Sequence, residues 1–193
     1  MSVREITTKM NRLLEPMGFF RRGKAWNRKT QSFVDVIDLQ KSKSNDMVTI
    51  TAGVLERQVS TMLENREPSE FAQQTMCTVG VRIGELGDGR DKWWQIDNVG
   101  VADEIADSIA TRILPFLERM HTREAMKHWL VSANVTKRRY PPPIINLAIL
   151  EHLLGDPAKG CAILADLQKM TPSGGWRMRA AEVAARLGCT PEI

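Results

Sequence analysis

The hydrophobic periodicity of the sequence changes twice along the chain, and this constrains the fold more than any other feature. Apolar residues recur every three or four positions over residues 3–17, alternate with polar residues in segments between 19 and 96, and return to the longer spacing from Val101. A period near 3.6 is typical of an amphipathic helix, and a period of two is typical of a half-buried strand. The sequence therefore predicts a helix, a group of strands and further helices, which is the α+β class.

The alternating region predicts about five strands, at residues 19–29, 32–42, 47–55, 77–84 and 93–96. Most links between them are of hairpin length, so we expect an antiparallel sheet. The helix near the N-terminus and a long helix at 101–120 are expected to pack on its apolar face. The polar stretch 56–76 is expected to be a loop with one or two helical turns.

The chain beyond residue 120 reads as a small helical region. A helix is expected at 123–133, followed by an elbow at 134–143, because three consecutive prolines do not continue a helix. Further helices are expected at 144–154, 157–169 and 176–187, with Gly155 and Gly188 as C-terminal stops and Asp156 as an N-cap. These patterns predict an α+β domain at 1–120 and a helical subdomain at 121–193.

Two adjacent tryptophans, Trp93 and Trp94, stand in the last predicted strand. Successive strand residues point to opposite faces, so we expect Trp94 in the core and Trp93 on the outer face. The alternation of the fourth strand places Cys77 with Val79 on the inner face, and Arg82 on an outer face of small Thr and Gly residues. An alternative is that a C-terminal helix covers this face and makes Trp93 a core residue.

The bulk composition is that of an ordinary globular protein, with 193 residues of which 42% are hydrophobic and 26% are charged. The first residues mix charged with apolar side chains, so no signal peptide is expected, and no run of about 18 apolar residues predicts a membrane span. The three cysteines, Cys77, Cys161 and Cys189, match no zinc-ligand spacing. We expect reduced thiols and a cytoplasmic location.

The positive charge is concentrated near the N-terminus. Residues 1–60 carry 11 Lys and Arg against 6 Asp and Glu, whereas the remainder carries 16 against 17. The stretch 21–29 is the most basic, and Trp26 within it is a candidate stacking platform for single-stranded nucleic acid. The alternative is a solvated basic edge strand that discourages association between sheet edges.

Several motifs occur together in the first 120 residues. They are LLEPMGFFRRGKAWNR, VDVIDLQKS, TAGV, CTVGVRIGEL and WW, and they hold Gly18, Phe19, Trp26, Arg28, Gln40, Ser42, Gly53, Arg82, Trp93 and Trp94. With them the chain resembles, over about residues 5–120, the bacterial family catalogued as domain of unknown function 4304. The resemblance implies a cytosolic bacterial protein and no defined activity. Thr51-Ala52 stands where the family usually has Asn before the Gly-Val pair.

The sequence holds no recognisable catalytic or metal-binding pattern. There is no phosphate-binding loop and no HExxH, and Asp35 and Asp38 are expected on opposite faces of a strand. We therefore expect a non-enzymatic, cofactor-free protein-binding module, immunity-like or chaperone-like, with no membrane partner. Its expected binding residues on the outer sheet face are Arg28, Gln40, Arg82, Trp93 and Gln95. The alternative function is single-stranded nucleic-acid binding through residues 21–29.

Overall fold

The computed structural model describes residues 2–134, 138 and 140–189. Two compact units are present. The first contains the chain up to Leu55 together with Ser69–Met120, and the second contains Glu56–Pro68 together with the chain from His121 onward. Residues 56–68, which the sequence patterns assign to the first domain, therefore pack with the helical unit.

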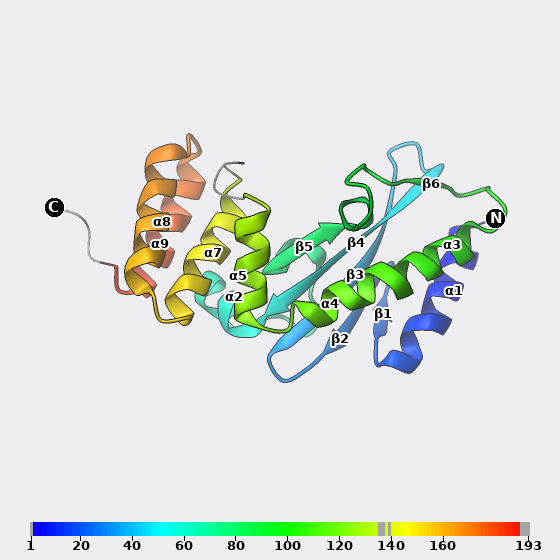
Figure 1. The fold of residues 1–193 in the computed structure, drawn as a ribbon, viewed down its shortest axis with the longest axis horizontal. Coiled ribbons are helices and arrows are strands. Elements are labelled where there is room, and N and C mark those ends of the chain that lie inside the picture. Colours follow the sequence, from blue (N-terminus) through cyan, green and yellow to red (C-terminus); the bar gives the residue numbers. More distant parts are fainter. Residues whose placement is uncertain (1, 135–137, 139, 190–193) are drawn as a thin grey trace. The chain divides into compact units, whose positions relative to one another are not determined.

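The first unit combines an antiparallel sheet with helices, so the predicted α+β class is confirmed (Figure 1). Its elements are α1 (Val3–Leu14), β1 (Phe20–Arg22), β2 (Ala25–Lys29), β3 (Phe33–Lys41), β4 (Met47–Glu56), β5 (Val79–Arg82), β6 (Trp94–Gln95), α3 (Val101–Ser108) and α4 (Leu114–Arg119). The strands run in the order β1-β2-β3-β4-β5, and β6 also pairs with β4.

Two details of the sheet differ from the predicted strands. Residues 19–29 form a hairpin rather than one strand, because Gly23 takes a positive φ of 65° that reverses the chain between β1 and β2. The segment 87–91 does not close a hairpin between β5 and β6. Instead, both strands pair with β4, at Thr51–Val54 and at Met47–Val48 respectively.

The core of this unit lies between the sheet and the helices α1 and α3, which pack side by side in Figure 1. Ile6 and Met10 of α1 are fully buried, as is Ile105 of α3. Trp94 is 5% exposed and points into this core, which confirms the predicted direction of the two tryptophans. Burial of these apolar side chains is the main term that stabilises the unit.

The long helix predicted at 101–120 is interrupted close to Pro115. A π-helical turn at Ile109–Ile113 separates α3 from α4, and Pro115 lies in the first turn of α4. Proline has no N–H for the regular helical hydrogen bond, so an irregularity here is the expected consequence.

In the part of the second unit that the structure describes, all regular elements are helices. Its elements are α2 (Arg57–Glu64), α5 (Arg123–Ser132), α7 (Pro141–Leu153), α8 (Pro157–Met170) and α9 (Gly174–Arg186). The three prolines at 141–143 open α7 instead of preceding it, because N–H groups in the first helical turn have no intrahelical partner to lose. Residues 135–137 and 139 of the predicted elbow lie outside the described residues. Asp156 caps α8 as predicted, accepting a hydrogen bond from the Lys159 N–H at 3.0 Å.

A disulfide joins Cys161 of α8 to Cys189, just beyond α9, with their Cα atoms 5.5 Å apart. The prediction of three reduced thiols is therefore wrong for this pair, and Cys77 is the free cysteine. Sequence spacing alone did not reveal the bond, since the α8–α9 turn is what brings the two residues together.

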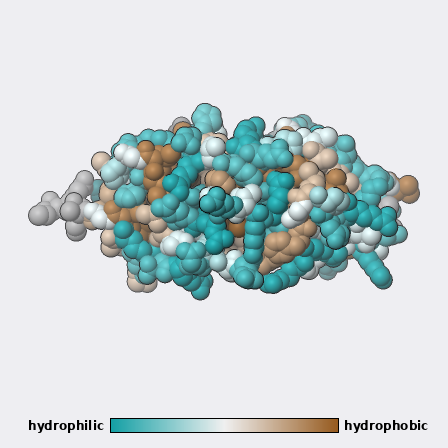
Figure 2. All heavy atoms as spheres, turned by 90° about the horizontal axis from the view of Figure 1, so that it is seen from below, coloured by the Kyte–Doolittle hydropathy of each residue, from teal (hydrophilic) through white to brown (hydrophobic). Residues whose placement is uncertain are grey.

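Hydrophilic side chains dominate most of the face drawn in Figure 2, and smaller hydrophobic patches lie between them, some of them over the C-terminal helices. Within the described residues, no helix combines the length and apolar character needed to cross a bilayer.

Candidate functional site

The sheet has two faces with different surroundings. Trp26 on β2 donates from Nε1 to Oδ1 of Asn11 on α1 at 3.2 Å, so the face that carries Trp26 is the inner face. Trp26 pairs with Ile37 on β3. Alternation then sends the next residue, Asp38, to the opposite side, which we call the outer face.

Three polar residues form one row across the outer face. Thr51 on β4 pairs with Arg82 on β5. The hydrogen bond from Ser42 N to Met47 O at 2.9 Å closes the β3–β4 hairpin, and counting back along the antiparallel strands places Asp38 beside Thr51. Asp38, Thr51 and Arg82 therefore lie on three neighbouring strands at the same level.

One end of the outer face is covered by residues 71–77. The side chain of Asn27 donates to Ala72 O at 3.1 Å and accepts from Ala72 N at 2.7 Å, which ties this segment to β2. A Cβ on Gly53 would lie 2.7 Å from the Cβ of Cys77, so the segment needs glycine beneath it. Ala72, Met76 and Cys77 of the segment pack against three strand residues, Val34, Val36 and Leu55, in one hydrophobic cluster.

Cys77 thus contacts the outer side of the sheet, and its predicted place on the inner face beside Val79 is wrong. The alternation fails because β5 begins at Val79, while Cys77 follows a 3₁₀ turn at Gln74–Met76. Burial, and secondarily the nearby charge of Asp35, raises the pKa of the Cys77 thiol. This thiol is therefore protonated and inert at neutral pH.

The loop at 88–93 covers another part of the outer face. Thr49 of β4 donates from Oγ1 to Lys92 O at 2.7 Å. A Cβ on Gly84 would lie 1.8 Å from Arg90 O, so this approach of two backbone segments excludes every larger residue. These contacts fix the position of the two loop side chains that matter most, Asp91 and Trp93.

Arg82 is the centre of a polar cluster on this face. Its Nη1 donates to both carboxylate oxygens of Asp91 at 2.8 Å, and its Nη2 donates to Oε1 of Gln40 at 3.4 Å. The guanidinium carbon lies 5.5 Å from the centroid of the Trp93 ring, and Trp93 Nε1 donates to Asp91 at 2.9 Å. Asp91 therefore holds both the cation and the indole in place, which is a preorganised arrangement.

The charges in this cluster remain accessible. The Arg82 and Asp91 side chains are 38% and 52% exposed, and Trp93 is half-buried. The hydrogen bond from Trp93, followed by that from Arg82, lowers the pKa of Asp91, so it is ionised at neutral pH. An exposed ion pair of this kind contributes little to stability, about 0–1 kcal/mol.

Beside the cluster, Thr51 and Asp38 place polar groups on the outer face that do not stabilise the fold. Thr51 is 3% exposed, and among the described residues its Oγ1 has no hydrogen-bond partner. Asp38 is half-buried, and burial raises the pKa of its carboxyl, with the Lys24 charge opposing. A buried hydroxyl without a partner destabilises the fold by about 1–3 kcal/mol, so a group of this kind is a candidate for contacting a ligand.

The structure brings only some of the five expected binding residues together, namely Gln40, Arg82 and Trp93. Gln95 is exposed on the same face, two residues beyond Trp93. Arg28 is not part of this surface. It pairs with Asp35 at 2.8 Å and stacks on Phe19 at 4.8 Å, and it shares the inner face with Trp26, two residues earlier on β2.

Trp26 is also excluded as a stacking platform, because it is fully buried. A different aromatic cluster lies at the β1 end of the outer face. The rings of Phe20 and Phe71 meet edge to face with centroids 5.5 Å apart. Arg22 lies over the Phe71 ring at 4.9 Å and Lys29 over the Phe20 ring at 5.4 Å. We call these four residues the aromatic–cation cluster.

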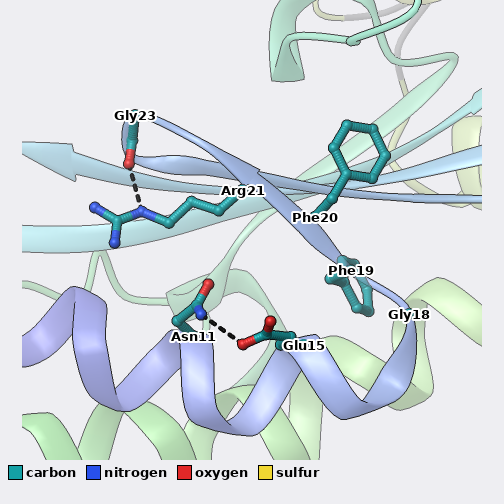
Figure 3. A pocket seen from close by; sticks show the side chains of 7 residues that line it. All are labelled: Asn11, Glu15, Gly18, Phe19, Phe20, Arg21 and Gly23. Carbon is teal, nitrogen blue, oxygen red and sulfur yellow. Dashed lines mark hydrogen bonds between the residues drawn. The ribbon is translucent and has the colours of Figure 1, made fainter.

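A shallow hollow of about 710 Å³ lies on the other side of β1, between this strand and α1 (Figure 3). Arg21 donates from Nε to Gly23 O at 2.7 Å, and Asn11 donates to Glu15 at 2.9 Å. Both hydrogen bonds join groups within the hollow, and the opposite charges of Arg21 and Glu15 share its open surface. Its lining residues are Asn11, Glu15, Gly18, Phe19, Phe20, Arg21 and Gly23.

Sequence reasoning missed Asp91 and Phe71, which complete the two clusters. Both lie in segments that the periodicity assigns to loops, where no pattern indicates which strand a side chain reaches. The apolar run VDVIDL did carry a signal, since two carboxylates, Asp35 and Asp38, stand out among its apolar residues.

No group of three potential metal ligands occurs among the residues that the structure describes. The sequence profile of the family described as Domain of unknown function (DUF4304) matches residues 10–119, more than half of the chain. No curated protein and no solved structure matches this chain. Both clusters lie within the matched segment.

Proposed function

This chain belongs to the DUF4304 family, whose description assigns no activity, and we propose from its own site that it is a non-enzymatic protein-binding module. The proposed binding surface is the outer face around Gln40, Arg82 and Trp93. The observation that carries the proposal is the Arg82–Trp93 stack, which Asp91 holds beside Thr51, whose hydroxyl has no hydrogen-bond partner among the described residues.

The composition of this surface favours a protein as its ligand. Trp and Arg are the residue types in which the energy of protein–protein binding is concentrated. Trp93 and Arg82 lose little conformational entropy on binding, because the carboxylate of Asp91 already restrains both side chains. The side chains around them, Gln40 and Asp91, are polar, as at the rim of a protein interface, whereas small-molecule sites are lined mainly by apolar side chains.

Asp38 and Thr51 add specificity to the proposed surface. A partner that places a hydrogen-bond donor here would pair with the half-buried carboxylate of Asp38 and reach toward Oγ1 of Thr51. The Thr51 hydroxyl has no hydrogen-bond partner among the described residues, so the free protein carries the energetic cost of this group and a partner that satisfies it gains affinity. We place the module among immunity-like or chaperone-like proteins, which act by binding another polypeptide.

The test is selection from a random-peptide display library against the immobilised full chain. Peptides selected by the wild type are expected to lose binding at least about tenfold to the Arg82→Ala/Trp93→Ala variant, since each interface anchor contributes roughly 2 kcal/mol. Arg90→Ala is the matched control, because Arg90 is a loop cation next to Asp91 that is 88% exposed and pairs with Asp88, which is outside the cluster.

Circular dichroism and thermal melting establish that the double variant is folded. Selected peptides that bind the double variant as tightly as the wild type would overturn the proposed surface. A library that yields no specific peptide from the wild type would count against a peptide-binding function altogether.

We also propose a cytoplasmic, bacterial setting, which rests on the family and on the composition of the chain. The Cys161–Cys189 bond stands against this location, because disulfides persist mainly in oxidising compartments. Thiol trapping in intact cells decides the point, since a reduced pair is expected in the cytoplasm.

A further inference from the structure

We infer that the aromatic–cation cluster of Phe20, Arg22, Lys29 and Phe71 is a second binding site, and that its ligand is single-stranded nucleic acid. The site goes beyond the proposed protein-binding surface, with which it shares no residue. It also differs from the site that the sequence indicates, because the stacking surface is Phe20 with Phe71 instead of the buried Trp26.

The strand β1 sorts its basic residues between the two faces of the sheet. Figure 3 shows Arg21 directed toward α1 and Phe20 directed to the opposite side of the strand. Phe20 pairs with Asn27, whose amide bonds to Ala72 on the outer face. Arg22, two residues after Phe20, therefore shares its face. This is why Arg22 contacts Phe71, the neighbour of Ala72 in sequence.

The geometry of the cluster suits a flexible polyanion that carries flat bases. Phe20 is 41% exposed, so part of its ring is open to a stacking base. Arg22 and Lys29 are exposed, and each lies over one of the two rings. Stacking of bases on the rings and contacts of phosphates with the two cations are the two interactions that sequence-independent single-strand sites combine.

The local charge and the place of β1 in the sheet support the same ligand. Residues 19–34 contain five Lys and Arg and no Asp or Glu. Strand β1 is at the end of the strand order β1-β2-β3-β4-β5, so a chain can approach its outer edge. A duplex offers the same phosphates, but its bases are already stacked on one another and do not reach the Phe rings.

The direct test is fluorescence anisotropy of the full chain with labelled dT12 and with a U12 oligonucleotide, at several salt concentrations. Phe20→Ala is expected to weaken binding about 5- to 150-fold, the range for loss of one stacked base. Arg22→Ala and Lys29→Ala should each weaken binding and reduce the slope of log K against log salt by about 0.7.

The matched control is Arg21→Ala, which removes the same charge from the adjacent residue on the other face of β1. Its expected effect on affinity is less than twofold at moderate salt. Phe20→Leu keeps an apolar side chain without the aromatic ring, so a loss with this variant separates stacking from folding. Glu70→Gln removes the carboxylate that precedes Phe71 and should strengthen binding.

Three results would overturn the inference. One is an Arg21→Ala variant that loses as much affinity as Arg22→Ala, which would mean that only net charge matters. Another is equal affinity for a duplex of the same length or for a polyglutamate peptide, which would assign the cluster to polyanions in general or to acidic proteins. The third is no binding of either oligonucleotide at low salt. None of these results bears on the peptide selection that tests the outer-face surface.

Discussion

The Cys161–Cys189 bond gives the most quantitative prediction for this protein. The two cysteines are separated by 28 residues and enclose most of α8 and all of α9. Closing a loop of this length removes chain entropy from the unfolded state that corresponds to about 3.6 kcal/mol at 25 °C. Reduction of the bond, or the Cys161→Ala/Cys189→Ala variant, should therefore lower the free energy of unfolding of the helical unit by about that amount.

The expected shift in melting temperature follows from the size of this unit. For a domain of about 60–100 residues, 1 kcal/mol corresponds to about 4–8 °C, so the transition of the helical unit should fall by about 15–30 °C. Differential scanning calorimetry with and without reductant measures the shift. Hydrogen exchange followed by mass spectrometry should show faster exchange in α8 and α9 and unchanged exchange in the sheet.

Controls separate the bond from other effects of the reductant. The double-alanine variant should show no response to reductant, and thiol titration of the denatured wild type should find the single free thiol of Cys77. The reasoning would be refuted if protein that titrates with a single thiol, and so carries the bond, gave a melting curve that reductant leaves unchanged.

Three further predictions concern stability and are measured by chemical denaturation. Thr51→Val removes a buried hydroxyl that has no partner among the described residues, so it should raise the free energy of unfolding by about 1 kcal/mol. The same variant should bind the selected peptides more weakly, which would separate the effect on binding from the effect on stability. Gly53→Ala should destabilise it by about 1–3 kcal/mol, because the new Cβ would lie 2.6 Å from Val79 O; an unchanged denaturation midpoint would contradict this packing. Burial raises the pKa of Glu151, but the hydrogen bonds from Lys127 and Lys159 outweigh it, so the pKa is lowered overall. The ionised Glu151 therefore stabilises the fold at pH values above the pKa of the unfolded chain, and this stabilisation is lost as the pH falls through the pKa of the folded chain. Glu151→Gln should therefore be less stable than the wild type at pH 7, and the difference should vanish at low pH; a constant difference at every pH would argue against the ion pairs.

Much of the secondary structure followed from local patterns. The apolar stripe over residues 3–17 predicted α1, and the hairpin-length link predicted between residues 42 and 47 is a turn in which Asn45 has a positive φ of 64°. The cap at Asp156 and the stop at Gly155 were also visible in the sequence. These features depend on neighbours within a few residues, so the sequence carries them directly.

The errors arose where distant segments meet. The sequence did not show that Cys77 crosses to the outer face, that Arg28 faces inward, or that β6 pairs with β4. In each case the result depends on where a strand begins or which strand lies beside it, and a shift of one residue reverses every side chain.

By itself, the sequence determined the α+β class, the order of the elements, the opposite directions of Trp93 and Trp94, and the concentration of charge in residues 21–29. Only the tertiary structure decided that Asp91 joins Arg82 to Trp93, that Phe71 meets Phe20, and that Cys161 bonds to Cys189. The physical reason is that periodicity and turn chemistry act between near neighbours. A binding cluster instead depends on side chains from loops and strands that become neighbours only when the whole chain has folded.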